Sequence, residues 1–183
     1  DLIAVEDRKV LAQDLDRELP RALARTHGRL TIEPQMSHTA DALPVLLRTT
    51  NGTAVQLQLL SARDRALWPT ERRRLVQRYK DAPEAALSVP TLPAFVASKT
   101  VTWADRHAAR DLWDLWALSQ IGAIDVTAAD LFRRHGPTNR PPAPHLFHRA
   151  PSDAEWQSQL AAQTKLTVSA HEALIAVRNA WGQ

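Results

Sequence analysis

The sequence lacks cysteine and contains few glycines, and each shortage excludes a class of functional site. Without cysteine the chain has no disulfide, no thiolate zinc site and no cysteine nucleophile. Its five glycines are scattered, which argues against a P-loop or a GxGxxG dinucleotide fingerprint. No apolar run approaches the roughly 18 residues that span a membrane. We therefore expect no membrane association, and the absence of cysteine suits a cytoplasmic protein.

Lysine is also scarce, because only 4 of the 23 basic residues are lysines and 19 are arginines. Arginine is the better bidentate reader of phosphate, so a nucleotide or RNA partner is reasonable. The alternative is that a composition rich in alanine and arginine merely reflects the base composition of the gene. At 183 residues the chain fits one domain, or a small domain with a helical appendage. Because the first residue is Asp1 rather than Met, we expect the natural N-terminus to be missing.

The first sixty residues have the pattern of a mixed α/β fold. Residues 1–5 resemble the end of a buried strand, and residues 6–23 form an amphipathic helical pattern. The apolar positions of that helix are Val10, Leu11, Leu15, Leu19 and Leu23. Three β-rich segments follow, at 29–36, 44–50 and 53–62. Asn51-Gly52 lies between the last two and predicts a tight hairpin.

The segment 53–62 alternates in polarity, as a half-buried strand does. One face carries Ala54, Gln56 and Gln58, and the other carries Val55, Leu57 and Leu59. The polar face either lines a cleft or faces solvent.

The remainder of the chain is expected to be irregular and then helical. Residues 63–84 are charged and predicted to be irregular or partly helical, whereas one or two helices are expected over 94–120. A capping-box pattern at Thr127–Asp130 predicts the start of the next helix. Two more helices follow a proline-rich linker at 136–151, and a second capping-box pattern, Ser152–Glu155, predicts the start of the first of them. The shift near residue 90 predicts an α/β part at 1–90 and a helical part at 91–183.

The stretch SKTVTWADRHAARDLWDLW, residues 98–116, combines a lysine with an Arg-Asp pair and a second Asp. On one straight helix, three charged side chains lie within about 60° of Lys99. They are Arg106, Arg110 and Asp114. Asp111 would lie about 120° away from Lys99, out of reach unless the helix breaks between Asp105 and Ala108. The simpler interpretation is a solvated helix face on which Arg110 pairs with Asp114.

The order of these residues resembles AbiEii-type (MenT-like) nucleotidyltransferase toxins. In that family an Asp-x-Asp strand precedes a helix, a small sheet, a lysine-bearing helix and an R-D-x-x-D helix. Here Asp1-Leu-Ile is similar to the second Asp of the pair, and Lys99 and Arg110–Asp114 stand where the later motifs do. The resemblance implies an α+β fold. Its parts would be a minimal polymerase-β-like nucleotidyltransferase sheet with helices and a helical C-terminal half.

The resemblance also implies chemical roles. Asp1 would be a catalytic ligand of Mg²⁺ or Mn²⁺, Lys99 would contact the triphosphate, and Asp111 would complete the catalytic site. Arg106 and Arg110 would help to bind the nucleotide. The substrates would be an NTP and the 3′ acceptor end of tRNA, and nucleotide addition there would inhibit translation. A cognate antitoxin protein is the expected partner.

One departure from the family pattern keeps a second hypothesis open. Many polymerase-β-like enzymes place a third carboxylate on a following strand, where this sequence has Gln58, a neutral and weaker candidate metal ligand. The chain could therefore be a nucleotide- or RNA-binding pseudoenzyme without turnover. A purely structural helical adaptor is a third possibility.

Two further groups of residues were considered as sites. The run ERRRLVQR predicts either an exposed helix or a contact with RNA phosphates through Arg72, Arg73, Arg74 and Arg78. His145 and His148 have a spacing that suits a metal, but they lie among prolines without a nearby acid, which argues against zinc. The tryptophans at helical spacing are expected in the core. These are Trp103, Trp113 and Trp116.

Overall fold

The computed structural model describes residues 2–41, 43–63, 67–77 and 84–182. The chain forms two compact units, residues 1–67 and 68–183. Each unit has its own hydrophobic core and is described by itself. Among the described residues, no helix combines the length and the apolarity that crossing a bilayer requires.

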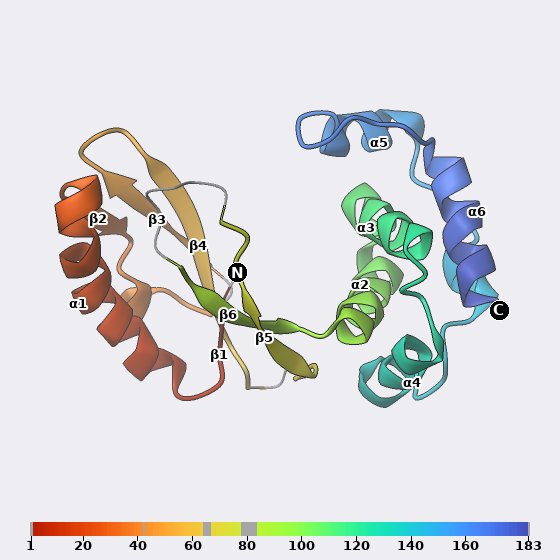
Figure 1. Ribbon diagram of the computed structural model, residues 1–183, viewed down its shortest axis with the longest axis horizontal. Coiled ribbons are helices and arrows are strands. Elements are labelled where there is room, and N and C mark those ends of the chain that lie inside the picture. Colours follow the sequence, from red (N-terminus) through yellow and green to blue (C-terminus); the bar gives the residue numbers. More distant parts are fainter. Residues whose placement is uncertain (1, 42, 64–66, 78–83, 183) are drawn as a thin grey trace. The chain divides into compact units, whose positions relative to one another are not determined.

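The first unit is a four-stranded mixed sheet packed on one long helix (Figure 1). Its strands are β1 (Leu2–Ala4), β2 (Leu30–Glu33), β3 (Pro44–Thr49) and β4 (Ala54–Ser61). The helix α1 (Arg8–His27) and a short 3-10 helix, η1 (Met36–His38), complete the unit. The strand order is β1-β4-β3-β2, in which β1 runs parallel to β4 and the other pairs are antiparallel.

Local chemistry explains the ends of α1 and the hairpin. Asp7 caps the helix, because its carboxylate accepts hydrogen bonds from the backbone N–H of Lys9 and of Val10. The helix ends at Gly28, whose φ of 73° suits glycine. The predicted hairpin between β3 and β4 is confirmed, and Gly52 supplies a φ of 89° in its turn.

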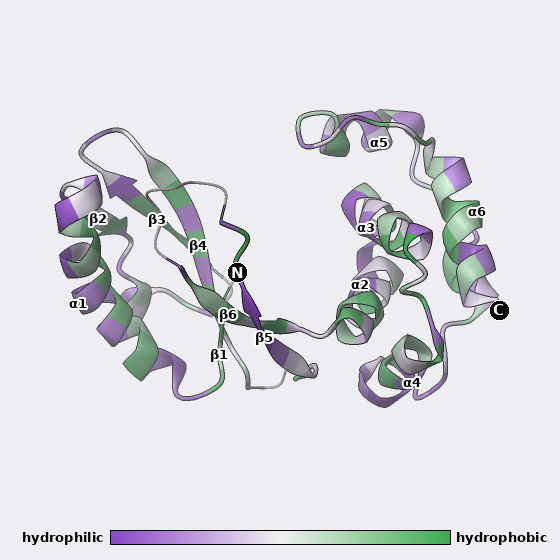
Figure 2. Cartoon of the chain, in the orientation of Figure 1, coloured by the Kyte–Doolittle hydropathy of each residue, from purple (hydrophilic) through white to green (hydrophobic). Residues whose placement is uncertain are grey.

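The core of the first unit confirms part of the expected apolar face of α1. Leu15, Leu19 and Leu23 pack against the buried residues of the sheet. Val10 is 57% exposed, so the beginning of the predicted apolar face was wrong. Hydrophobic and hydrophilic bands alternate along β4 (Figure 2), and of the apolar positions only Leu59 is fully buried. The sheet therefore buries one end of β4 more deeply than the other.

The second unit begins with a two-stranded antiparallel sheet, which the sequence analysis did not predict. Its strands are β5 (Thr70–Arg74) and β6 (Ala86–Pro90). The interpretation of the arginine run as a helix was therefore wrong. Backbone pairing with β6 decides the conformation of β5, because its own residues have no strong β pattern. The domain division at residue 90 stays a prediction, because the compact units divide at residue 67.

Five helices follow, with the bounds α2 (Leu92–Arg106), α3 (Ala109–Gln120), α4 (Val126–His135), α5 (Asp153–Leu160) and α6 (Ala170–Trp181). A 3-10 helix, η2 (Pro144–Phe147), lies within the proline-rich segment. The helix α4 starts two residues earlier than expected, because Asp125 and not Thr127 caps it by accepting from the Ala128 N–H. The predicted capping box of Ser152 and Glu155 is confirmed at α5.

The main core of this unit lies between α2, α3, α5 and α6. Trp103, Leu112 and Leu115 are fully buried in it, and Trp113 and Trp116 pack against it, as the sequence analysis predicted for the tryptophans. The Trp103 Nε1–H donates to the Leu146 carbonyl at 2.8 Å, so the proline-rich segment is tied to α2. This core holds α2 and α3 in a fixed relation.

We predict that Leu112→Ala lowers the free energy of unfolding of the second unit by about 3–5 kcal/mol, because it removes a fully buried side chain and leaves a cavity. Val126→Ala is the control, since Val126 is 78% exposed, and it should change stability by less than about 0.5 kcal/mol. Urea unfolding of both variants checks this. Equal stability of the two variants would contradict the described core.

Candidate functional site

A helix break determines the geometry of the site. The helix α2 ends at Arg106, and His107 adopts a left-handed conformation with φ 50° and ψ 35°. Its N–H donates to the Trp103 carbonyl, which closes the last turn of α2. The next helix, α3, begins at Ala109. The break therefore falls between Asp105 and Ala108, which is where it must fall for Asp111 to reach Lys99.

Asp111 is the centre of the site. Its side chain is fully buried. Arg106 binds it in a bidentate manner, with Nε 2.7 Å from Oδ2 and Nη2 3.0 Å from Oδ1. Lys99 Nζ lies 3.4 Å from Oδ1. Two cations from α2 thus face one buried carboxylate from the first turn of α3.

The charge state of Asp111 follows from this arrangement. Burial acts to raise the pKa of the Asp111 carboxyl, but the hydrogen bonds and positive charge of Arg106, and the charge of Lys99, outweigh it. The pKa of Asp111 is therefore held below its ordinary value. The hydrogen bonds that Arg106 donates to Asp111 raise the pKa of Arg106 in turn. Asp111 and Arg106 are therefore both ionised near neutral pH.

Lys99 has a second acidic partner. Its Nζ lies 2.5 Å from Oδ2 of Asp114, one helical turn after Asp111 on α3. The Lys99 side chain is 23% exposed and the Asp114 side chain 37% exposed, so this pair reaches solvent whereas Asp111 does not. Phe95 lies beneath the ammonium group, with its ring centroid 5.6 Å from Nζ. Lys99 is thus held near the surface between the buried Asp111 and the partly exposed Asp114.

The structure brings together Lys99, Arg106, Asp111 and Asp114, and it separates Arg110 from them. Arg110 is exposed, and within the described part of the chain it forms no ion pair. The straight-helix pairing of Arg110 with Asp114 was therefore wrong, because the break turns α3 so that Asp114 meets Lys99. The nucleotide-binding role of Arg110 stays a prediction.

The other predicted site residues lie elsewhere in the fold. Asp1 and Arg78 lie outside the described residues. Gln58 lies on β4 and is partly buried, and its neighbour Leu59 pairs with Leu2 of β1. Arg72, Arg73 and Arg74 lie on β5 and alternate between its faces.

Arg73 and Arg74 have acidic partners. Nη2 of Arg73 lies 2.9 Å from Oε1 of Glu71, and Nη1 of Arg74 lies 3.8 Å from Oε2 of Glu84. The positive charge of this run is therefore partly offset by one carboxylate on β5 and by another just before β6.

The described residues do not by themselves fit a divalent metal ion. Among them, no three His, Cys, Asp or Glu side chains come together in a group that could hold one. Asp111 and Asp114 are already paired with cations. A metal would therefore need ligands beyond the Lys99 cluster, which consists of Lys99, Arg106, Asp111 and Asp114.

Two pockets in the structure were not predicted from the sequence. One, of about 830 Å³, lies in the first unit around the start of α1 and includes Arg8, Lys9 and Arg63. The other, of about 390 Å³, lies beside Arg106 in the second unit. The charged residues that follow β1 are a sequence signal that could have indicated the first pocket. The second is assembled from segments about forty residues apart and has no local signal.

We predict that Asp111→Asn lowers the free energy of unfolding by about 2 kcal/mol at neutral pH, because it removes charge-assisted hydrogen bonds and leaves Arg106 without its anion. Because the folded-state pKa of Asp111 is lowered, this stabilisation is complete above the ordinary aspartate pKa of about 3.9. It is lost as the pH falls through the lower folded-state pKa, so the difference between wild type and variant should shrink in strong acid.

The matched control is Asp114→Asn, which affects an exposed pair and should cost less than about 1 kcal/mol. Chemical unfolding of the three proteins from pH 7 down to pH 2.5 measures both effects. A difference between Asp111→Asn and wild type that stays constant across this range would show that the Asp111 carboxylate is not the titrating group.

Comparison with known proteins agrees with the arrangement found here. A family model described as "Nucleotidyl transferase AbiEii toxin, Type IV TA system" matches residues 1–180, nearly the whole chain. No curated protein and no solved structure matches. The α+β architecture, with a small mixed sheet followed by helices, is consistent with a nucleotidyltransferase-like fold. The chain belongs to the AbiEii family of nucleotidyltransferase toxins of type IV toxin–antitoxin systems.

Proposed function

We propose that this protein transfers nucleotides from an NTP to the 3′ acceptor end of tRNA and so inhibits translation. Family membership supports nucleotidyl transfer by a toxin. The structural observation that supports the transfer chemistry is the cluster of Lys99 and Arg106 around the buried Asp111. Nucleotidyl transfer releases pyrophosphate, and cations that are already positioned stabilise the charge that develops on the leaving group.

Lys99 is the residue that we assign to the triphosphate. Its ammonium is partly exposed and is shared between a buried and an exposed carboxylate. A triphosphate carries more negative charge than Asp114, so it can replace Asp114 as the partner of Lys99. Asp111 is fully buried and holds Lys99 near the surface during this exchange. Lys99 would then neutralise the phosphate oxygens as the bond to pyrophosphate breaks.

Arg106 and Asp111 have distinct roles in this proposal. Two guanidinium nitrogens of Arg106, Nε and Nη2, bind Asp111, and its side chain is still 52% exposed. The remaining N–H groups can donate to a phosphate. Asp111 completes the site by fixing both cations, and Arg110 is proposed as a further, exposed contact to the nucleotide.

Metal dependence belongs to the proposal as well. Enzymes of this kind use Mg²⁺ or Mn²⁺ to orient the triphosphate and activate the attacking hydroxyl. We propose Asp1 as a ligand, because it resembles the second Asp of the family's Asp-x-Asp pair, with Gln58 on β4 as a further candidate. A cognate antitoxin and a cytoplasmic location complete the proposal.

We predict that wild-type protein, incubated with labelled NTPs, Mg²⁺ and total tRNA, incorporates label at the tRNA 3′ end. Lys99→Ala and Asp111→Ala should each lower the rate on the order of 100-fold or more, because the triphosphate loses a positioned cation or its support. Lys165→Ala is the control, since Lys165 is exposed and lies in the loop before α6, and its rate should match wild type. Chelation with EDTA should abolish incorporation, and added Mg²⁺ or Mn²⁺ should restore it.

Gln58 supports the second candidate, a pseudoenzyme that binds nucleotide or RNA without turnover. A neutral amide stands on β4 where many polymerase-β-like enzymes have a carboxylate. Binding of NTP or tRNA by wild-type protein without incorporation of label would favour this candidate and contradict the enzyme. Incorporation that Lys99→Ala leaves unchanged would instead contradict the site assignment.

A further inference from the structure

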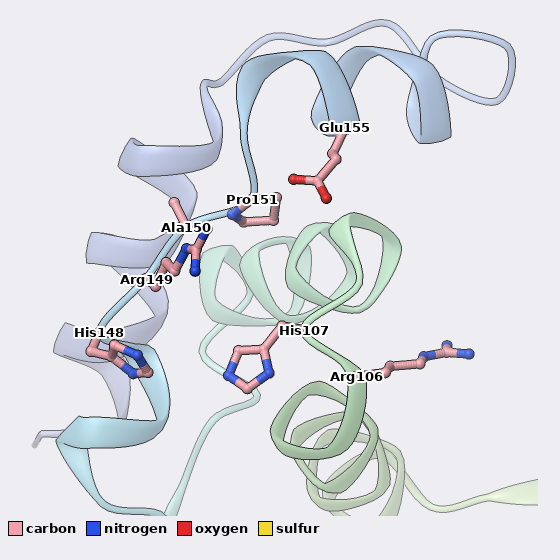
Figure 3. Close-up of a pocket in the computed structure, with 7 residues that line it drawn as sticks. All are labelled: Arg106, His107, His148, Arg149, Ala150, Pro151 and Glu155. Carbon is pink, nitrogen blue, oxygen red and sulfur yellow. The ribbon is translucent and has the colours of Figure 1, made fainter.

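A polar pocket of about 390 Å³ lies at the C-terminal end of α2, next to the Lys99 cluster (Figure 3). Three separate segments line it. Arg106 and His107 come from the end of α2, His148 and Arg149 from the segment before α5, and Glu155 from α5 itself. All of these residues belong to the second unit. Their clustering therefore does not depend on the first unit.

The histidine wall of the pocket is held by its neighbours. The His107 ring centroid lies 4.9 Å from that of the buried Trp103, and 6.2 Å from that of His148. The His148 Nδ1 lies 2.6 Å from the His145 carbonyl, which accepts its hydrogen. Both histidines are exposed. A fixed, exposed aromatic ring is a surface on which an unpaired nucleic-acid base can stack.

The cations of the pocket suit a phosphate group. Arg149 is exposed and forms no ion pair among the described residues. Arg106 is committed to Asp111 through Nε and Nη2, and its Nη1 makes no hydrogen bond within the described part of the chain. Arginine donates readily to phosphate oxygens. Arg149 therefore supplies the guanidinium that is available to a phosphate in the pocket, because the Arg106 side chain points away from the other lining residues (Figure 3).

Glu155 limits which phosphate can bind. Its Oε2 accepts hydrogen bonds from the N–H and hydroxyl of Ser152, and these bonds lower the pKa of the Glu155 carboxyl. The carboxylate is therefore ionised and repels a multiply charged triphosphate. Its other oxygen is able to accept from a ribose hydroxyl or a base amino group. A singly charged phosphodiester with its sugar and base matches this combination better than a free triphosphate does.

We propose that this pocket binds one nucleotide of the acceptor RNA, with its phosphodiester at Arg149, its base against His107 and a hydroxyl or amino group at Glu155. The inference rests on the proposed function, because it takes the acceptor to be RNA. Arg106 borders both the pocket and the Lys99 cluster, so an RNA held here lies beside the cluster.

We predict that Arg149→Gln weakens the binding of a 5′-labelled single-stranded RNA and of total tRNA about ten-fold, and reduces the salt dependence by roughly one phosphate contact. His107→Asn should weaken RNA binding to a similar degree, because asparagine tolerates the left-handed backbone but offers no ring. Fluorescence anisotropy at several salt concentrations measures both. NTP affinity should stay at the wild-type value.

The control is Arg134→Gln, since Arg134 is exposed on α4 and does not line the pocket. RNA affinity that falls equally in Arg149→Gln and Arg134→Gln, or wild-type protein that binds no RNA, would overturn the inference. A loss of NTP affinity in Arg149→Gln would also overturn it and assign the pocket to the triphosphate.

Transfer assays separate this inference from the proposed function. A raised KM for tRNA with an unchanged kcat in Arg149→Gln would support both the RNA-binding pocket and the proposed function. Transfer with an unchanged KM in Arg149→Gln and in His107→Asn would contradict the pocket and leave the function intact. RNA binding that requires Arg149, without any nucleotide transfer by wild type, would support the pocket and contradict the function.

Discussion

The buried carboxylate of Asp111 is the constraint on which the site depends. A fully buried negative charge is costly unless cations and hydrogen bonds compensate it, and here Arg106 and Lys99 provide both. That compensation is possible only because the chain turns at His107, so that α3 folds back against α2. The tryptophan-rich core then holds the two helices in this relation. The helix break, the core and the ion cluster are therefore parts of one arrangement.

In the proposed function, the same arrangement presents Lys99 to an incoming anion. Asp111 neutralises the two cations from the buried side. On the exposed side, Asp114 pairs with Lys99, and solvent reaches both cations. An exposed carboxylate is an easily replaced partner, whereas a buried one is not. In the proposed function, Lys99 would therefore be positioned before a triphosphate arrives, and binding would have to create little side-chain order. This pre-organisation links the packing of the second unit to the chemistry that its family performs.

Much of the fold could be predicted from residue patterns, and the failures have physical causes. The Asn-Gly hairpin, the Ser152 capping box and the helical second half follow from local signals. The strand β5 could not be predicted, because pairing with β6 determines it and its own residues are mostly charged. Within the site, the pair of Lys99 and Asp111 was expected only if the helix broke between Asp105 and Ala108, as it does, whereas the pairs of Arg106 with Asp111 and of Lys99 with Asp114 were not predicted. A straight helix pairs Asp114 with Arg110, and only the left-handed His107 makes Lys99 its partner.

The most direct measurement is a crystal structure of the full chain with a non-transferable NTP analogue and Mg²⁺. The account predicts that Lys99 Nζ leaves Asp114 and donates to a triphosphate oxygen, while Arg106 keeps its bidentate contact with Asp111. A triphosphate bound away from Lys99, with the pair of Lys99 and Asp114 intact, would contradict the account.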